Sequence, residues 1–287
     1  MAALWKREFR SYFQSMVGYL FIALILAFVG VFLWLNNLSG GYPNFEYTLS
    51  SITILFLLLI PILTMRTMTE ERQKRTDQLL YALPLTSTQI LLSKFAALAA
   101  VFAIPCGVMF FYPMLLGVYG TVNFATAYTG LLGFFLLGCA LLALALFLSS
   151  FSDNQIVAAA TTFAVIFLLY LMSSFSSAIP ADAAVSFWSF VLLVLALSPV
   201  VYLLSRAWVV TIAFGVVGVA ALSISYLVKP ALFEGALGAV MRFVSVFDRF
   251  IIFTNGMFDI GNLVYLITFC AFFLFLAIEV FEKRRWS

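Results

Sequence analysis

The sequence predicts an all-α protein that crosses a membrane about eight times, and three observations support this fold class. Hydrophobic residues make up 65% of the chain. Charged residues make up only 9% of it, whereas a soluble domain is about 25% charged. Apolar runs long enough to cross a bilayer, which takes roughly 20 residues in a helix, recur along the sequence. A chain with so little polar surface needs lipid around it.

Eight apolar runs are candidate spans within a single predicted domain, residues 1–287: 17–36, 49–67, 88–117, 123–149, 155–173, 184–204, 207–228 and 261–281. The third run contains Pro105 and Pro113, which can kink or break a helix. Only two residues separate the sixth run from the seventh, so this pair forms either a tight hairpin or a less regular membrane-embedded region. If the extra pair does not span, six spans remain.

The placement of Lys and Arg predicts the orientation in the membrane. With both termini inside, only Lys229, Arg242 and Arg249 of the 15 Lys and Arg residues lie outside, which leaves 12 inside. Cytoplasmic loops carry such an excess of positive charge. The first apolar run is longer than the core of a signal peptide, so we expect it to be retained. The sequence thus predicts a multi-pass protein of the cytoplasmic (inner) membrane with both termini in the cytoplasm.

Residues 2–15 predict an amphipathic helix at the inner membrane interface. Its apolar residues recur at helical spacing: Trp5, Phe9, Tyr12, Phe13 and Met16. Its basic residues lie mostly on the other side: Lys6, Arg7 and Arg10. Such a helix lies on the membrane surface with its basic face toward anionic headgroups. Contact of the polar face with a cytoplasmic partner is the alternative.

Residues 66–94 combine dense charge, an apolar patch and a break. Charges are dense up to Asp77, and four apolar residues follow: Leu79, Leu80, Tyr81 and Leu83. Pro84 disfavours helix for the residue before it, and Thr86 or Ser87 can cap the next helix. We expect a cytoplasmic segment with a short helix between the second and third spans. An ordinary charged loop explains the basic residues but not the apolar patch, which is typical of a protein contact.

This segment resembles the coupling region of ABC-2-type permeases, the membrane subunits of ABC exporters. The resemblance implies a site that couples to a separate ATPase, made of Glu70, Glu71, Arg72, Thr76, Leu79, Leu80, Tyr81, Leu83, Pro84 and Lys94. The sequence departs from the family pattern at three positions. Arg75 and Ser93 stand where the family has Gly, and Gln78 stands where it has Glu.

A second resemblance lies near the C-terminus. Residues 247–266 and the ending Glu282-Lys283-Arg284-Arg285-Trp286 are similar to gliding-motility-type ABC-2 permeases. The resemblance implies that residues 229–260 form an external re-entrant or interfacial helix before the last span. The residues expected to form an external gate there are Phe247, Phe250, Gly256 and Asp259. A plain interfacial loop helix is the alternative.

The sequence offers no catalytic or metal-binding pattern. It contains no histidine and no GxxxxGK[ST] phosphate-binding loop, and Cys106, Cys139 and Cys270 stand singly in apolar runs. We therefore expect no enzyme activity, no metal site and no cofactor in this chain. The resemblance implies that ATP and Mg²⁺ are bound by a partner ATPase, present in two copies.

The resemblance further implies a second permease, as a homodimer or heterodimer, in the lipid bilayer; an auxiliary membrane or extracytoplasmic subunit stays open, and no nucleic acid is expected. Two other functions are alternatives. One is a motor-independent secondary carrier or channel, which the scarcity of ionisable residues inside the spans disfavours. The other is a non-transporting scaffold or sensor driven by an ATPase partner. The apolar, aromatic spans favour lipid-like or amphipathic peptide cargo over sugars and ions.

Overall fold

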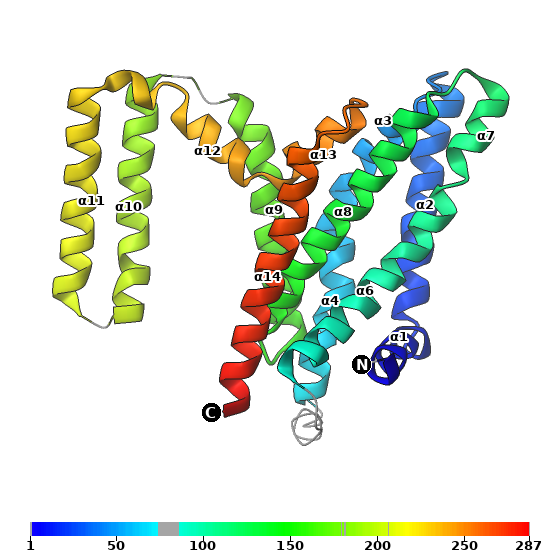
Figure 1. The fold of residues 1–287 in the computed structure, drawn as a ribbon, viewed down its shortest axis with the longest axis horizontal. Coiled ribbons are helices and arrows are strands. Elements are labelled where there is room, and N and C mark those ends of the chain that lie inside the picture. Colours follow the sequence, from blue (N-terminus) through cyan, green and yellow to red (C-terminus); the bar gives the residue numbers. More distant parts are fainter. Residues whose placement is uncertain (1, 74–85, 179, 181, 206, 287) are drawn as a thin grey trace. The chain divides into compact units, whose positions relative to one another are not determined.

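The computed structural model describes residues 2–73, 86–178, 180, 182–205 and 207–286. All regular elements in this part of the chain are helical, which confirms the all-α prediction (Figure 1). The chain divides into two compact units, Met1–Leu168 with Val246–Ser287, and Leu169–Ser245. We call them unit 1 and unit 2 and describe each by itself.

Seven helical segments in the described residues are long and apolar enough to cross a membrane, so the prediction of a polytopic membrane protein is confirmed. They are Val17–Ser39, Phe45–Gln73, Ser87–Tyr119, Phe124–Ser149, Gln155–Phe175, Thr211–Val228 and Ile260–Arg284. The remaining predicted span, 184–204, corresponds to helix α10 (Ala183–Ser205). Its described apolar part, Ala183–Ala196, is shorter than a span.

Unit 1 holds most of the helices. They are α1 (Ala2–Gln14), α2 (Val17–Leu33), the π-helix η1 (Trp34–Ser39), α3 (Phe45–Ile52), the 3₁₀ turn η2 (Thr53–Leu55), α4 (Phe56–Gln73), α6 (Ser87–Met109), α7 (Tyr112–Tyr119), α8 (Phe124–Ser149), α13 (Val246–Thr254) and α14 (Ile260–Trp286). Helix α9 (Gln155–Ala178) begins in unit 1 and continues into unit 2. Helix α1 and the end of α14 lie at the same end of unit 1 as the end of α4 (Figure 1).

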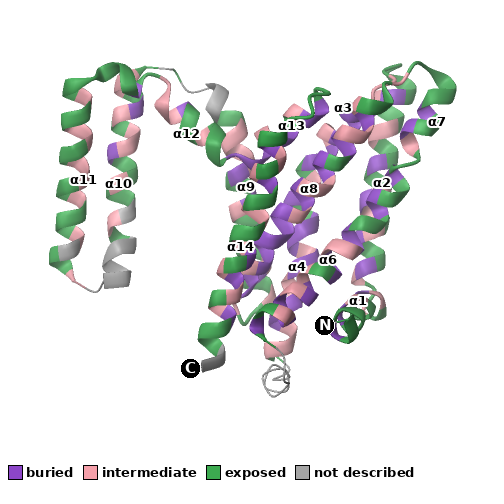
Figure 2. Cartoon of the chain, viewed as in Figure 1, coloured by how far each residue is buried: buried purple, intermediate pink, exposed green. Residues whose placement is uncertain are grey.

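Helix α8 forms the centre of unit 1 and packs against α4, α6, α13 and α14. All residues from 140 to 146 are buried, so neighbouring helices cover every side of α8 there (Figure 2). Two glycines allow this close approach. A Cβ on Gly133 would lie 2.8 Å from Phe253 of α13, and one on Gly138 would overlap the Phe102 ring of α6. Phe102 also packs against Phe134, with ring centroids 5.9 Å apart.

The third predicted span is broken, as its prolines suggested. Helix α6 keeps Pro105 in its interior and ends at Met109, and α7 restarts with Pro113 in its first turn, where the missing N–H is tolerated. The start of α6 is set by Thr86. Its hydroxyl accepts a hydrogen bond from the Gln89 backbone while the Gln89 side chain accepts one from the Thr86 backbone, a capping box.

Residues 229–260 form three short helices where the sequence predicted one. They are η3 (Pro230–Phe233), α12 (Ala236–Val244) and α13. The helical path is interrupted because Ser245 adopts an extended conformation, with φ −69° and ψ 110°. The interruption divides the segment, since η3 and α12 belong to unit 2 whereas α13 packs within unit 1.

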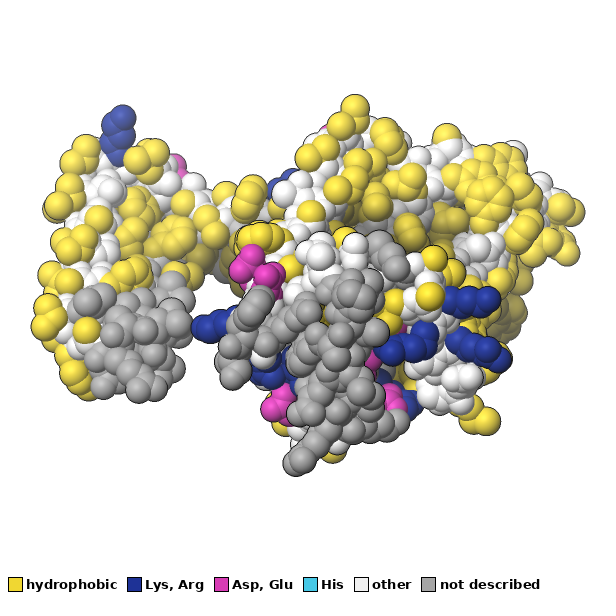
Figure 3. Space-filling view, turned by 60° about the horizontal axis from the view of Figure 1, so that its bottom comes forward, with side chains coloured by type: hydrophobic (Ala, Val, Ile, Leu, Met, Phe, Trp, Pro, Cys, Tyr) yellow, Lys and Arg dark blue, Asp and Glu magenta, His cyan; other side chains and the backbone are white. Residues whose placement is uncertain are grey.

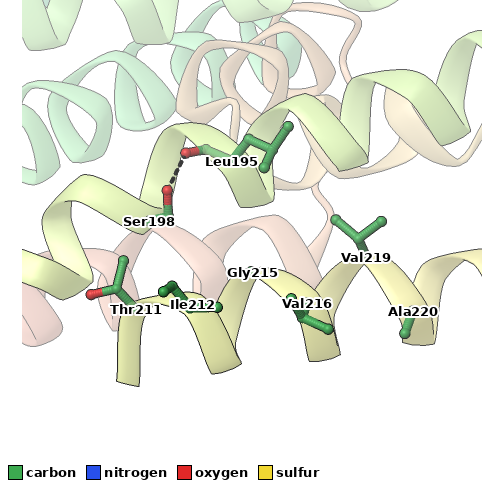
Figure 4. Close-up of a pocket in the computed structure, with 8 residues that line it drawn as sticks. All are labelled: Leu195, Ser198, Thr211, Ile212, Gly215, Val216, Val219 and Ala220. Carbon is green, nitrogen blue, oxygen red and sulfur yellow. Dashed lines mark hydrogen bonds between the residues drawn. The ribbon is translucent and has the colours of Figure 1, made fainter. Parts of the chain in front are cut away.

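Unit 2 is built on a helical hairpin, one of the two arrangements predicted for 184–228. Helix α10 packs against α11 (Trp208–Val228), and the rings of Phe187, Tyr226 and Phe233 tie η3 to both. A groove of about 550 Å³ runs between α10 and α11 (Figure 4). Its Ser198 and Thr211 hydroxyls both donate to carbonyls of their own helices, so the groove has an apolar character.

Candidate functional site

The predicted coupling residues lie around the last turn of α4. Glu70, Glu71 and Arg72 belong to this turn, and Lys94 lies near the start of α6. The other predicted coupling residues, Thr76, Leu79, Leu80, Tyr81, Leu83 and Pro84, lie outside the described residues. The structure therefore describes the base from which segment 74–85 leaves α4 and enters α6.

Lys94 lies at the centre of a buried group of charges. Its ammonium has no exposed surface and lies 2.7 Å from Glu71 Oε2 and 3.3 Å from Glu8 Oε2, and it also donates to the Thr67 carbonyl at 3.2 Å. Arg7 bonds both carboxylates in turn, at 2.6 Å from Glu8 and 3.1 Å from Glu71. We call Arg7, Glu8, Glu71 and Lys94 the charge bracket. Its two cations balance two carboxylates and join α1, α4 and α6.

Two further observations describe the environment of the bracket. The Tyr12 hydroxyl shares a 2.8 Å hydrogen bond with the Thr67 hydroxyl, and burial raises the pKa of Tyr12, so this phenol stays neutral. Partial burial lowers the pKa of Arg7. Hydrogen bonds and charge from Glu8 and Glu71 together raise that pKa by more, so it lies above its usual value. The α1–α4 contact is therefore both polar and fully paired.

Helix α1 has a different buried face from the one predicted. Its protein-facing residues are Leu4, Glu8 and Tyr12, spaced four apart. The sequence analysis grouped Tyr12 with the apolar residues Trp5 and Phe9, whereas in the structure Tyr12 is buried and shares a hydrogen bond with Thr67 of α4. Trp5 and Phe9 stack with ring centroids 5.5 Å apart on a separate face.

The basic residues Lys6, Arg7 and Arg10 are exposed, in agreement with a polar face. The sequence analysis missed Glu8 altogether. Glu8 could have been noticed as the single acidic residue among three basic ones, because it lies four residues from both Leu4 and Tyr12.

A second cluster holds the loop between α8 and α9. Asp153 Oδ1 accepts hydrogen bonds from Arg72 at 3.3 Å and from Arg284 of α14 at 3.0 Å. Arg72 also donates to the Ser152 carbonyl at 3.0 Å, and Arg284 to the Phe151 carbonyl at 2.8 Å. We call Arg72, Asp153 and Arg284 the Asp153 cluster. Figure 3, which turns the lower end of Figure 1 forward, shows Lys and Arg side chains gathered on this face with acidic groups between them.

Burial separates the two clusters energetically. Lys94 has a side-chain exposure of 0%, whereas Asp153 has 76%. Removing one partner of a buried ion pair costs about 3–5 kcal/mol, whereas exposed pairs contribute about 0–1 kcal/mol. The charge bracket therefore has its central cation excluded from solvent, whereas the Asp153 cluster has its central carboxylate in solvent and Arg72 at 10% exposure.

Glu70 and Glu71 both pair with basic residues. Glu70 lies 3.0 Å from Arg66 one turn earlier on α4, and Glu71 pairs within the charge bracket. Role assignments beyond this pairing stay predictions.

The predicted gate residues lie in α13 and in the turn between α13 and α14. Phe247 and Phe250 are buried in unit 1, with the Phe250 ring 6.2 Å from that of Phe134. Gly256 has a φ of 78°, which favours glycine. Asp259 accepts hydrogen bonds from the Gly261 backbone at 2.9 Å and from Asn262 at 2.6 Å.

A residue that the sequence analysis did not assign to the gate completes this region. Arg249 donates to Asn262 Oδ1 at 3.1 Å and lies 5.0 Å from the centre of the Tyr265 ring. Asn262 thereby links Arg249 of α13 to Asp259 at the start of α14. The arrangement fixes the α13–α14 corner, and the gate itself stays a prediction. Among the described residues, no group of three or more His, Cys, Asp or Glu side chains could hold a metal ion.

A comparison with known protein families identifies the family of the chain. The family model for ABC-2 family transporter proteins matches residues 35–279. The chain belongs to the ABC-2 transporter family. A search of curated proteins returned no match.

Membership makes the protein a membrane permease of an ABC transporter. The match includes Glu71, Arg72, Lys94 and Asp153 of this permease. It does not include Arg7 and Glu8 of α1 or Arg284 of α14. Each cluster therefore combines partners inside and outside the matched range.

Proposed function

We propose that this permease couples ATP hydrolysis by a separate ATPase subunit to the export of a substrate. In this proposal, two ATPase copies and a second permease complete the transporter, and the pathway opens between the two permeases. The ATPase docks on the apolar patch Leu79–Leu83, with α1 and the α8–α9 loop as lesser contacts. The observation that carries the proposal is the base of α4, where ion pairs hold the helix on two sides.

The base of α4 can transmit force because the helix is continuous. Helix α4 runs from Phe56 to Gln73, about 27 Å at 1.5 Å per residue. Its first residues pack in the core of unit 1, where the rings of Phe56 and Phe134 lie 4.7 Å apart. Displacement of segment 74–85 would therefore reach the centre of the helix bundle through one helix, which continues past Pro61.

The orientation and cargo belong to the same proposal. The excess of Lys and Arg supports a cytoplasmic position for α1, the base of α4 and the end of α14, in the inner membrane. The corner at Arg249, Asn262 and Asp259 then faces outside, where α13, held in unit 1 by the buried Phe247 and Phe250, would cover the outer mouth. Apolar, aromatic spans favour lipid-like or amphipathic peptide cargo, and the resemblance to gliding-motility-type permeases stays a prediction.

Replacement of a docking residue tests the proposal. Leu80→Asp places a charge in the apolar patch and should abolish co-purification of the ATPase, while the permease still inserts into the membrane. Leu38→Asp is the matched control, since Leu38 is an exposed apolar residue in η1, which directly follows α2. Retention of the ATPase by the Leu80→Asp variant would show that the patch does not dock it.

A further inference from the structure

The loop between α8 and α9 is held in its conformation by hydrogen bonds of its own residues. The Ser152 hydroxyl donates to the Asn154 carbonyl at 2.9 Å and accepts from the Asn154 backbone N–H at 3.2 Å. Asn154 Oδ1 accepts from the Ile156 backbone N–H at 2.9 Å, which caps the start of α9. Because these bonds fix the loop internally, a force on Asp153 moves the start of α9 with it.

The last residues of α4 hold this loop directly. Arg72 bonds the Ser152 carbonyl and Asp153, and Gln73 accepts a hydrogen bond from the Gln155 side chain at 3.3 Å. Gln73 is the residue immediately before segment 74–85. Arg284 of α14 bonds the same Asp153 oxygen, so one carboxylate joins α4, the α8–α9 loop and α14.

The two sides of the α4 base differ in how easily they separate. Glu71 and Arg72 are neighbours in sequence and point about 100° apart around the helix. Glu71 enters the charge bracket, where Lys94 is excluded from solvent. Arg72, with 10% of its side chain exposed, meets Asp153, which is 76% exposed, so water can hydrate the Asp153 carboxylate when the groups part. A moving α4 would keep α1 and α6 and release the α8–α9 loop and α14.

We propose that Asp153 is a positioning residue, which holds the α8–α9 loop and α14 against the base of α4 at rest and lets go when segment 74–85 is driven. This inference rests on the proposed coupling function. In it, the charge bracket stays closed throughout the cycle. The contact between the base of α4 and the α8–α9 loop then opens, while the charge bracket keeps α1, α4 and α6 joined.

The first test examines the contact itself in the purified permease, without an ATPase. Asp153→Asn should raise amide hydrogen exchange of residues 150–156 by about two- to fivefold, the range expected for loss of an exposed charge contact. Asp153→Glu should restore protection. Glu282→Gln, which removes an exposed carboxylate near the end of α14, is the matched control. Unchanged exchange in Asp153→Asn would overturn the inference.

The second test examines coupling in the complex with its ATPase in liposomes. Asp153→Asn should raise basal ATP hydrolysis by about two- to fivefold with no change in the amount of bound ATPase, a result that a purely structural role would not produce. Arg284→Gln should raise hydrolysis by a smaller factor, because Arg72 still bonds Asp153 in that variant.

A tether tests whether the contact must open. Gln73→Cys with Gln155→Cys, in a background without Cys106, Cys139 and Cys270, can be joined by a short, cleavable thiol-specific cross-linker. Cross-linking should stop the ATP hydrolysis that depends on the permease. Cleavage of the cross-linker should restore this hydrolysis. Full hydrolysis by the tethered complex would overturn this inference alone. If the wild-type permease binds no ATPase, the proposed function fails and the inference fails with it.

Discussion

The charge bracket makes a quantitative prediction for Lys94→Met. Methionine fills a similar volume but removes the ammonium, so Glu8 and Glu71 are left with Arg7 as their remaining bracket cation. Loss of one partner from a buried ion pair costs about 3–5 kcal/mol. Arg7 still neutralises one carboxylate, and both carboxylates keep some exposure, so we expect a cost near the lower limit, about 3 kcal/mol.

Thermal unfolding in a neutral detergent measures this cost. Since 1 kcal/mol shifts the Tm of a domain of 150–250 residues by about 2–4 °C, the Tm of Lys94→Met should fall by about 6–12 °C. Lys6→Met is the matched control, because Lys6 is exposed on α1 and surface substitutions usually change stability by less than about 0.5 kcal/mol. Equal Tm values for the two variants would refute the reasoning.

A second substitution in the bracket distinguishes charge balance from simple packing. Glu8→Gln should lower the Tm of the wild-type protein, because Lys94 loses one of its two carboxylates. In the Lys94→Met background, the same change should raise the Tm, because it removes the carboxylate that was left in excess and leaves Arg7 paired with Glu71. A decrease in both backgrounds would contradict the proposed charge balance.

Two other predictions concern the backbone of unit 1. Gly138→Ala should destabilise the protein by about 1–3 kcal/mol, because the added methyl overlaps the buried Phe102 ring; Gly215→Ala, with nothing within 4 Å of its Cβ, is the control, and equal Tm values for both variants would contradict the overlap. Met16→Gly should raise the Tm, since Met16 has a φ of 59° between α1 and α2 and relief of this conformation is worth about 1 kcal/mol. Met114→Gly, inside helix α7, should lower it, and a Tm decrease in both would refute the argument.

The membrane-length helices could be predicted from sequence because the bilayer imposes a single strong requirement. A span must be apolar over its whole length and must satisfy its own backbone, and both requirements are visible in local composition. The start of α6 was also readable, since Thr86 and Gln89 form a local capping box. These features depend on residues close together in the chain.

The partners across helices could not be predicted in the same way. Glu8 lies 86 residues before Lys94, and nothing in either local sequence indicates that they meet. A helix that is apolar all round gives no period that marks the face packed on its neighbours, so the burial of α8 on every side was not visible. The division of residues 229–260 depends on Ser245, whose extended backbone has no strong sequence signature.

The two clusters that hold the base of α4 each combine partners inside and outside the family match. Within residues 35–279, the base of α4 pairs Glu71 with Lys94 and Arg72 with Asp153. Outside that range, the exposed Arg7 and the buried Glu8 add mutually compensating charges to the first pair, whereas Arg284 adds an exposed cation to the second. The additions therefore act unequally. In the proposed mechanism, the first joint stays closed around the buried Lys94, whereas water can hydrate the exposed Asp153 carboxylate of the second. Under the proposed function, this inequality sets which side of α4 yields when segment 74–85 is driven.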